Sequence, residues 1–169
     1  MGGCSEVPPD YSAPIVEPTP MPMPDDTLGE FQQEMLDAIN DVRAVPRKCG
    51  NTMFPSAGPV GWDYLLEQAA QRHSTDMFDN GFFSHEGSDG TNASHRVSDT
   101  GYEWLSIGEN IAFGFATIDG VINGWLSSPG HCANIMSPYW QHMGVSKVDK
   151  YWTQVFGLPL EVYNPEIGL

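Results

Sequence analysis

Basic residues and long apolar runs are both scarce in this sequence. Only 7 Lys and Arg residues stand against 22 Asp and Glu residues in a chain of 169, which gives a formal net charge of −15. Binding to nucleic acid or to anionic lipid needs clustered cations, so the charge balance argues against both partners. No apolar run approaches the roughly 18 residues of a transmembrane helix. We therefore expect a water-soluble monomer, or a protein tethered by something other than a transmembrane segment.

Cysteine is also rare, and its count is odd. Three cysteines allow three single-bridge arrangements, each of which leaves one thiol over. Cys49 and Cys132 lie in the part of the chain that carries hydrophobic patterning, whereas Cys4 lies before it. We predict a Cys49–Cys132 disulfide, which points to an oxidising compartment. Buried free thiols are the alternative.

Residues 1–26 are rich in proline and show no apolar periodicity, which is typical of an extended, solvated linker. The run Gly3-Cys4-Ser5 is similar to the start of a mature bacterial lipoprotein, in which a lipid is attached to the cysteine that follows a removed signal peptide. We interpret residues 1–26 as a Pro-rich flexible tail with Cys4 as a candidate lipidation site, and residues 27–169 as one folded domain. An ordinary tail on a secreted domain is the alternative.

From residue 27 on, the pattern predicts a series of helices and strands. A capping box of Thr27 and Glu30 predicts the start of a first helix, which Pro46 ends. Asp63 is the predicted cap of a second helix, which Asn80-Gly81 ends. The further elements are a short helix at 94–100, a strand at 107–115, a third main helix capped by Thr117 and stopped by Ser128-Pro129-Gly130, and an antiparallel hairpin of 142–148 and 151–156. Helices that flank a small antiparallel sheet predict an α+β fold, a three-layer α-β-α sandwich.

Three short motifs place an imidazole or a carboxylate beside glycine or proline, at the loops and element ends where functional groups gather. They are Phe83-Ser84-His85-Glu86-Gly87, Gly108-Glu109-Asn110-Ile111 and Ser128-Pro129-Gly130-His131-Cys132. Two imidazoles and one carboxylate are donors that a divalent transition metal prefers. His85, Glu109 and His131 are therefore candidate metal ligands. His73, on the apolar stripe of the second helix, is expected to be a hydrogen-bonded core residue.

The order and spacing of these motifs resemble the bacterial branch of the CAP superfamily (cysteine-rich secretory proteins, antigen 5 and pathogenesis-related proteins), whose domain is also called SCP. The resemblance continues through Trp125, Asn134-Ile135-Met136, Gly144-Val145 and the run from Tyr151 to Gly157. It implies the CAP/SCP fold, an α-β-α sandwich. It also implies a cleft in which some members hold a divalent cation, such as zinc or magnesium, with two histidines and two glutamates.

His85, Glu109 and His131 match three of those four cleft positions. The other glutamate would fall near Ser128 and is absent. His142 stands where bacterial relatives often carry an acidic residue, so it is a candidate substitute ligand in the cleft. Asn110 is a further cleft candidate, for which a structural role in a turn is the alternative.

The resemblance implies a secreted, cell-surface or periplasmic protein, lipid-anchored if Cys4 is modified. We expect a ligand-binding or interaction module with an unknown extracellular ligand, such as a lipid or an envelope component. The alternative is a metal-dependent hydrolase or peptidase in which a cation activates water and Glu109 acts as base. An envelope interaction protein with a vestigial cleft is a third hypothesis. The zinc-protease pattern H-E-x-x-H that begins at His85 fails at Asp89, and no nucleophile elbow is present in the sequence.

Overall fold

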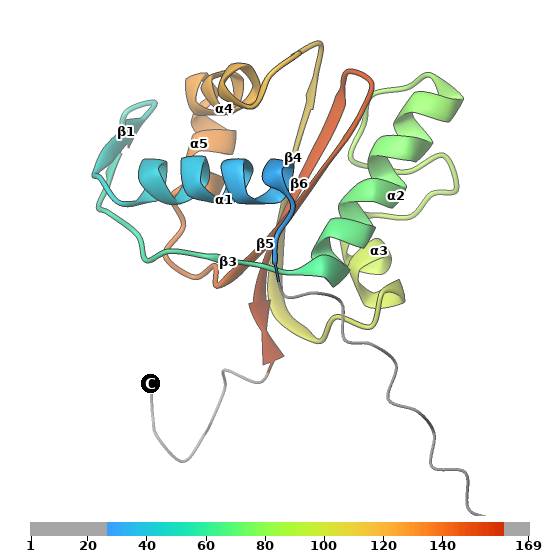
Figure 1. Ribbon diagram of the computed structural model, residues 1–169, viewed down its shortest axis with the longest axis horizontal. Coiled ribbons are helices and arrows are strands. Elements are labelled where there is room, and N and C mark those ends of the chain that lie inside the picture. The colour runs from blue at the N-terminus through green and yellow to red at the C-terminus, as the bar shows by residue number, and fades with distance from the viewer. Residues whose placement is uncertain (1–26, 161–169) are drawn as a thin grey trace, which may run out of the picture.

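The computed structural model describes residues 27–160 of the chain (Figure 1). Cys4, the predicted tail of residues 1–26 and the last residues, 161–169, lie outside this range. The linker and the lipid anchor therefore stay predictions. Within residues 27–160, no helix has the length and apolar character that crossing a bilayer requires.

The chain forms five helices and six strands within residues 27–160. The helices are α1 (Glu30–Arg43), α2 (Tyr64–Asn80), α3 (Ala93–Asp99), α4 (Ile118–Ser127) and α5 (Pro129–Ile135). The strands are β1 (Arg47–Cys49), β2 (Thr52–Phe54), β3 (Gly61–Trp62), β4 (Trp104–Phe113), β5 (His142–Val148) and β6 (Tyr151–Pro159). The predicted β5–β6 hairpin is confirmed, with its turn at Asp149-Lys150.

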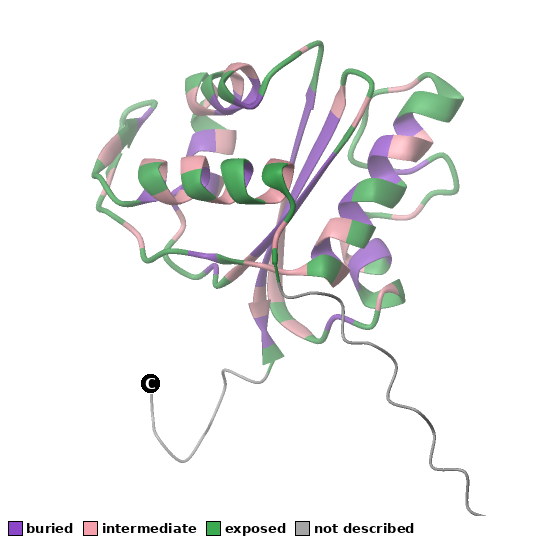
Figure 2. Ribbon diagram, in the orientation of Figure 1, coloured by how far each residue is buried: buried purple, intermediate pink, exposed green. Residues whose placement is uncertain are grey.

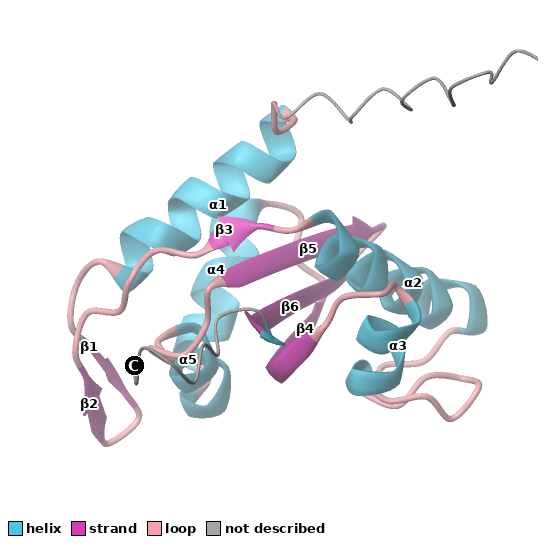
Figure 3. Ribbon diagram, turned by 90° about the horizontal axis from the view of Figure 1, so that it is seen from below, coloured by secondary structure: helices cyan, strands magenta, loops and turns pink. Residues whose placement is uncertain are grey.

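The predicted three-layer α-β-α sandwich is confirmed. The central sheet has the strand order β3-β5-β6-β4, so that β4 lies at one edge. Figure 3 shows α1, α4 and α5 on one face of this sheet and α2 and α3 on the other. The sheet is antiparallel except for the short β3, which pairs with β5 in parallel, a detail that the sequence pattern did not predict.

A hydrophobic core fills the space on each side of the sheet. The larger core holds Trp125 of α4 and Trp152 of β6, both 1% exposed, and the smaller one packs Leu66 of α2 against Val155 of β6. Buried residues follow the strands and the inward faces of the helices (Figure 2). On the face that α2 and α3 cover, the packing is close. A Cβ added at Gly144 of β5 would clash with the backbone nitrogen of Glu67. Helix α2 therefore rests directly on the β5 backbone.

Local capping explains where the helices begin and end. Asp63 accepts hydrogen bonds from two backbone amides at the start of α2, and Thr117 accepts one at the start of α4, as predicted. Gly81 ends α2 in the left-handed region, with φ of 65°. The predicted capping box is wrong: α1 begins at Glu30 behind the N-cap Gly29, and no side chain caps it. Because the helix starts later than expected, Glu30 is at its first position rather than its third.

The strands β1, β2 and β3 and the helix α5 were not predicted, and all four lie in regions rich in glycine and proline. Residues 47–54 form the small β1–β2 hairpin, separate from the main sheet. The predicted stop at Ser128-Pro129-Gly130 does end α4, but the same residues also begin α5, with Pro129 in its first turn. Proline suits that position because its missing N–H has no partner to lose there. His131 and Cys132 consequently lie on a helix rather than in a loop.

Candidate functional site

Strand β4 presents the two central site residues on opposite faces of the sheet. Successive side chains of a strand point to opposite sides. Glu109 faces α3, where its Oε2 accepts a hydrogen bond from Arg96 Nη2 at 2.8 Å. Asn110 faces α5, where its Nδ2 lies 3.5 Å from the carbonyl oxygen of His131. The site is therefore assembled across the edge of the sheet, from a layer on each side.

Glu109 is buried in a network of charges. Its side chain is 4% exposed, and its Oε1 receives a 2.8 Å hydrogen bond from His85 Nδ1. Arg96, 2% exposed, holds the other oxygen and also donates to the backbone carbonyls of Thr91 and His85. Burial alone raises the pKa of Glu109, but the hydrogen bond from His85 and the charge of Arg96 outweigh it and hold the pKa below its ordinary value. The carboxylate is thus ionised and engaged at both oxygens.

The carboxylate fixes the orientation of the His85 ring. Because His85 directs Nδ1 to Glu109, its Nε2 is the nitrogen that can reach a ligand, and the side chain is 57% exposed. A buried carboxylate that orients an imidazole in this way sets the position of the proton and the plane of the ring.

His73 supports the same loop from inside the core. Its side chain is fully buried, and its Nε2 lies 2.8 Å from the carbonyl oxygen of Ser84, next to His85 in the chain. Burial lowers the pKa of His73, so the ring is neutral and donates to that carbonyl. The expectation of a hydrogen-bonded core histidine is confirmed.

On the other face of β4, a chain of amides positions α5. Asn110 is 1% exposed and donates to Gln154 Oε1 at 2.9 Å, and Asn134 of α5 donates to Asn110 Oδ1 at 3.0 Å. Such a satisfied network of buried amides favours the structural role of Asn110. It holds in place the helix that carries His131.

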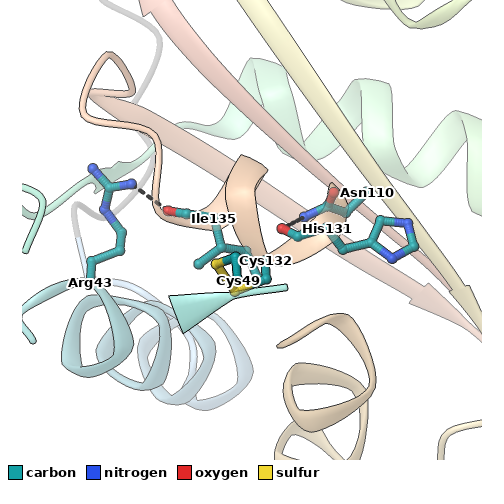
Figure 4. Close-up of a disulfide and its surroundings, with 6 residues drawn as sticks. All are labelled: Arg43, Cys49, Asn110, His131, Cys132 and Ile135. Atoms are coloured by element: carbon teal, nitrogen blue, oxygen red, sulfur yellow. Dashed lines mark hydrogen bonds between the residues drawn. A yellow bond between two sulfur atoms is a disulfide. The ribbon is translucent and has the colours of Figure 1, made fainter. Parts of the chain in front are cut away.

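The predicted disulfide is present and links α5 to β1. Cys49 in β1 and Cys132 in α5 are bridged, with 5.5 Å between their Cα atoms (Figure 4). Beside the bridge, the buried Arg43 of α1 donates to the carbonyl oxygens of Ile135 and Ser137 at 2.6 and 2.9 Å. Arg43 thereby satisfies the last carbonyl of this helix of seven residues, from which the half-buried His131 is presented.

The positive charge of His85 acts on His131. Burial, and after it the charge of His85, lower the pKa of His131. The structure thus pairs His85 directly with Glu109, while a shared site with His131 stays a prediction.

His142 has other partners. Its Nδ1 lies 2.9 Å from the hydroxyl of Tyr102 and 3.8 Å from Oδ2 of Asp63. It lines a cavity of about 230 Å³ whose walls include none of His85, Glu109 and His131. The structure therefore does not bring His142 to the candidate cleft.

These residues do not fit a three-ligand metal site. Both oxygens of Glu109 are engaged, by His85 and Arg96, and Ser128 stands where a second carboxylate is expected. Among residues 27–160, no three His, Cys, Asp or Glu side chains are grouped so that they could hold a metal ion. Two imidazoles remain as candidate ligands, and metal binding stays a prediction.

Arg96 and Arg43 are the site residues that sequence reasoning missed. Both lie in predicted helices with no motif around them, and both are more than nine-tenths buried. A signal for Arg96 existed: a glutamate expected in a buried strand needs a cationic partner, and the chain has only 7 Lys and Arg residues to supply it.

Comparison with known proteins supports the resemblance. The pattern of the Cysteine-rich secretory protein family (CAP) matches residues 36–156. Two Bacillus subtilis proteins are similar: the uncharacterised membrane protein YlbC is 33% identical over 125 residues, 74% of this chain, and the uncharacterised protein YkwD is 34% identical over 100 residues, 58% of this chain. The chain spans only 34% and 39% of their lengths.

Solved structures agree with the fold. An extracellular Bacillus anthracis protein containing an SCP domain is 30% identical with a TM-score of 0.65, over 74% of this chain and 39% of that one. An outer surface protein of Borrelia burgdorferi has a TM-score of 0.61 at 17% identity, over 76% and 90% of the two chains, which supports the fold alone. Because the family pattern covers well over half of the sequence and the three layers agree, the chain belongs to the CAP, or cysteine-rich secretory protein, family.

Proposed function

We propose that this chain is an extracellular interaction module that binds its ligand through the surface around His85 and His131. The observation that carries the proposal is the exposed His85 imidazole held at Nδ1 by the buried Glu109–Arg96 ion pair. A side chain that is already fixed loses little conformational entropy when a ligand binds. An ion pair buried behind an exposed ring is therefore well suited to recognition.

A cluster of aromatic rings that begins at Phe83, two residues before His85 in the chain, adds support. Phe83 and Phe113 are each 51% exposed, with ring centroids 6.3 Å apart, and the Tyr151 ring lies 4.7 Å from that of Phe113. Large apolar side chains that gather on a surface are typical of binding sites. Aromatic residues are also enriched in protein interfaces relative to the rest of the surface. The similarity to an extracellular Bacillus anthracis protein favours a ligand outside the cytoplasm.

The geometry favours a module over the hydrolase alternative. A general base must lie within hydrogen-bond reach of water or substrate, whereas the Glu109 side chain is only 4% exposed. Arg96 and His85 occupy both oxygens of Glu109, and the charge of Arg96 lowers the basicity of that carboxylate.

We expect ligand capture to depend on His85 and Phe83. The immobilised domain would be incubated with envelope extract of the native host, glycans and lipid vesicles, and binding would then be measured with each purified ligand. His85→Ala and Phe83→Ala are expected to weaken binding at least about tenfold, as truncations at the centre of an interface do. His95→Ala and Tyr139→Ala, at exposed positions elsewhere, are the matched controls and should bind as the wild type does.

Equal binding by all four variants would rule out this surface. Hydrolysis of ester or peptide substrates by the wild type, lost in Glu109→Gln, would replace the module with the hydrolase.

We expect only weak zinc binding, and no magnesium binding, in a calorimetric titration. Two imidazoles without a carboxylate make a poor zinc site, and magnesium prefers oxygen ligands. The heat should vanish in His85→Ala/His131→Ala and should weaken as pH falls, because protonated imidazoles cannot bind metal. Tight zinc binding that Glu109→Gln weakens would contradict this expectation and would show that Glu109 leaves Arg96 to join the imidazoles.

A further inference from the structure

The cavity that contains His142 is separate from the proposed recognition surface and is built differently. It lies where the start of α2 meets the end of β6 and the turn before β4. Its walls combine two carboxylates, two polar rings and two apolar side chains: Asp63, Glu103, Tyr102, His142, Leu65 and Pro159. A second cavity of about 400 Å³ shares Gly101, Tyr102 and Glu103 and extends the space along the chain toward Trp104.

We propose that this cavity binds a primary alkylammonium group, such as a lysine side chain or a small amine. The first argument is charge. Asp63 and Glu103 contribute two carboxylates, and no Lys or Arg lines either cavity. Within residues 27–160, the basic group recorded beside Asp63 Oδ2 is His142 Nδ1, at 3.8 Å.

Tyr102 and His142 pair with each other rather than with Asp63. The Tyr102 hydroxyl lies 2.9 Å from His142 Nδ1, whereas Asp63 Oδ2 lies 3.8 Å from that nitrogen, beyond hydrogen-bond reach. Burial, and after it the charge of Asp63, raise the pKa of Tyr102, so its hydroxyl keeps its proton and adds no charge to the cavity. The site therefore presents net negative charge in a partly enclosed space, where attraction to a cation is stronger than at an open surface.

The hydrogen bonds that Asp63 already accepts favour an ammonium ligand over a guanidinium ligand. Its Oδ1 accepts from the backbone amides of Leu65 and Leu66 at 2.9 and 3.0 Å, as the cap of α2. Only Oδ2 is left for a ligand, and that side chain is 22% exposed. A guanidinium binds a carboxylate best through two parallel hydrogen bonds, whereas an ammonium is a point charge that one oxygen satisfies.

The apolar walls suit the methylene stem of such a ligand. Leu65 and Pro159 line the same cavity as the carboxylates. Long amine side chains place their methylene groups on apolar surface while the charged head finds a polar partner. The excess of acidic residues in the chain, with a formal net charge of −15, attracts cations to the molecule as a whole.

The test is an NMR titration of the full chain with four probes. Nα-acetyl-lysine methylamide and n-butylammonium should give saturable shifts at the amides of Leu65, Leu66 and Tyr102, with a Kd on the order of 1 mM. The norleucine methylamide, which lacks the charge, should give none, and Nα-acetyl-arginine methylamide should bind more weakly than the lysine compound. Tighter binding of the lysine compound than of n-butylammonium would assign a peptide as the source, and equal binding would assign a free amine.

The deciding variant is Asp63→Asn, which removes the charge but keeps an N-cap of equal quality. It should weaken lysine-probe binding at least tenfold while the melting temperature stays close to that of the wild type. Asp119→Asn makes the same charge change in the first turn of α4 and should leave binding unchanged.

Undiminished binding by Asp63→Asn, equal shifts with the norleucine probe, or tighter binding of the arginine probe would each overturn the proposal. His85→Ala should not affect this titration, so the cavity and the proposed recognition surface can fail independently.

Discussion

Replacing Cys49 and Cys132 together with alanine is expected to lower the free energy of unfolding by about 4–5 kcal/mol. The bridge closes a loop with a sequence separation of 83, so its loss releases a large part of the unfolded chain from a constraint. Domains of this size are stable by only about 5–15 kcal/mol, which makes the expected loss a large fraction of the total. Urea denaturation followed by circular dichroism measures it, with the disulfide intact in the wild type.

The matched control is Cys4→Ala, which removes a cysteine outside the described domain and should not move the urea midpoint. Reducing agent should shift the wild type toward the double variant and leave that variant unchanged. We also expect the double variant to lose ligand capture at the His85–His131 surface, because Cys132 holds the helix that carries His131. A change in unfolding free energy below about 1 kcal/mol would mean that Arg43 and the Asn110 network fix α5 without the bridge.

Replacing Arg96 with methionine is expected to cost about 3–5 kcal/mol of stability, because it leaves the carboxylate of Glu109 buried without its cation. The double variant Arg96→Met/Glu109→Leu should recover part of this loss, since removing both partners leaves no uncompensated charge. The contrast is Arg72→Met. Arg72 bridges Asp89 and Asp99 with its side chain 42% exposed, so that variant should cost less than about 1 kcal/mol.

The same ion pair gives the protein a pH dependence at the acidic end. The pKa of Glu109 is lower in the folded chain than its ordinary value of 4.5, so the folded state binds protons less readily than the unfolded state. The stabilisation is therefore fully present above that ordinary value and is lost as pH falls through the lower pKa of the folded state. Urea midpoints measured across this range should fall with pH in the wild type and change less in Glu109→Gln. Equal slopes would contradict the assignment.

The sequence predicts most of the fold because its signals are local. Asp63, Gly81 and Thr117 cap or end helices through contacts within a few residues, and all three were predicted. The capping box at Thr27 failed although its residue types were right, because the start of α1 depends on packing as well as on the local pattern. Helix α5 was missed because a proline is typical both of the end of one helix and of the first turn of the next, and Pro129 stands at both.

In the site too, local motifs were predictable and contacts between distant elements were not. Imidazoles and carboxylates in glycine-rich motifs predicted His85, Glu109 and His131, of which His85 and Glu109 are in direct contact. Arg96 was not predicted because its role depends on a contact between α3 and β4, which no spacing in the sequence reveals. His142 has a partner of its own, Tyr102, forty positions earlier in the chain, and this pairing too is visible only in the folded chain.

The alternation of Glu109 and Asn110 along β4 also limits how this chain can change in length. Their register is fixed against Val155 and Gln154 of β6. Inserting or deleting one residue inside β4 would exchange the two side chains between the faces of the sheet, setting a carboxylate against α5 and an amide against Arg96. Both imidazoles would lose their support in one step. Natural variation in length is therefore expected in the turns on either side of β4, and within the strand a single lost or gained codon is expected to be more damaging than most substitutions.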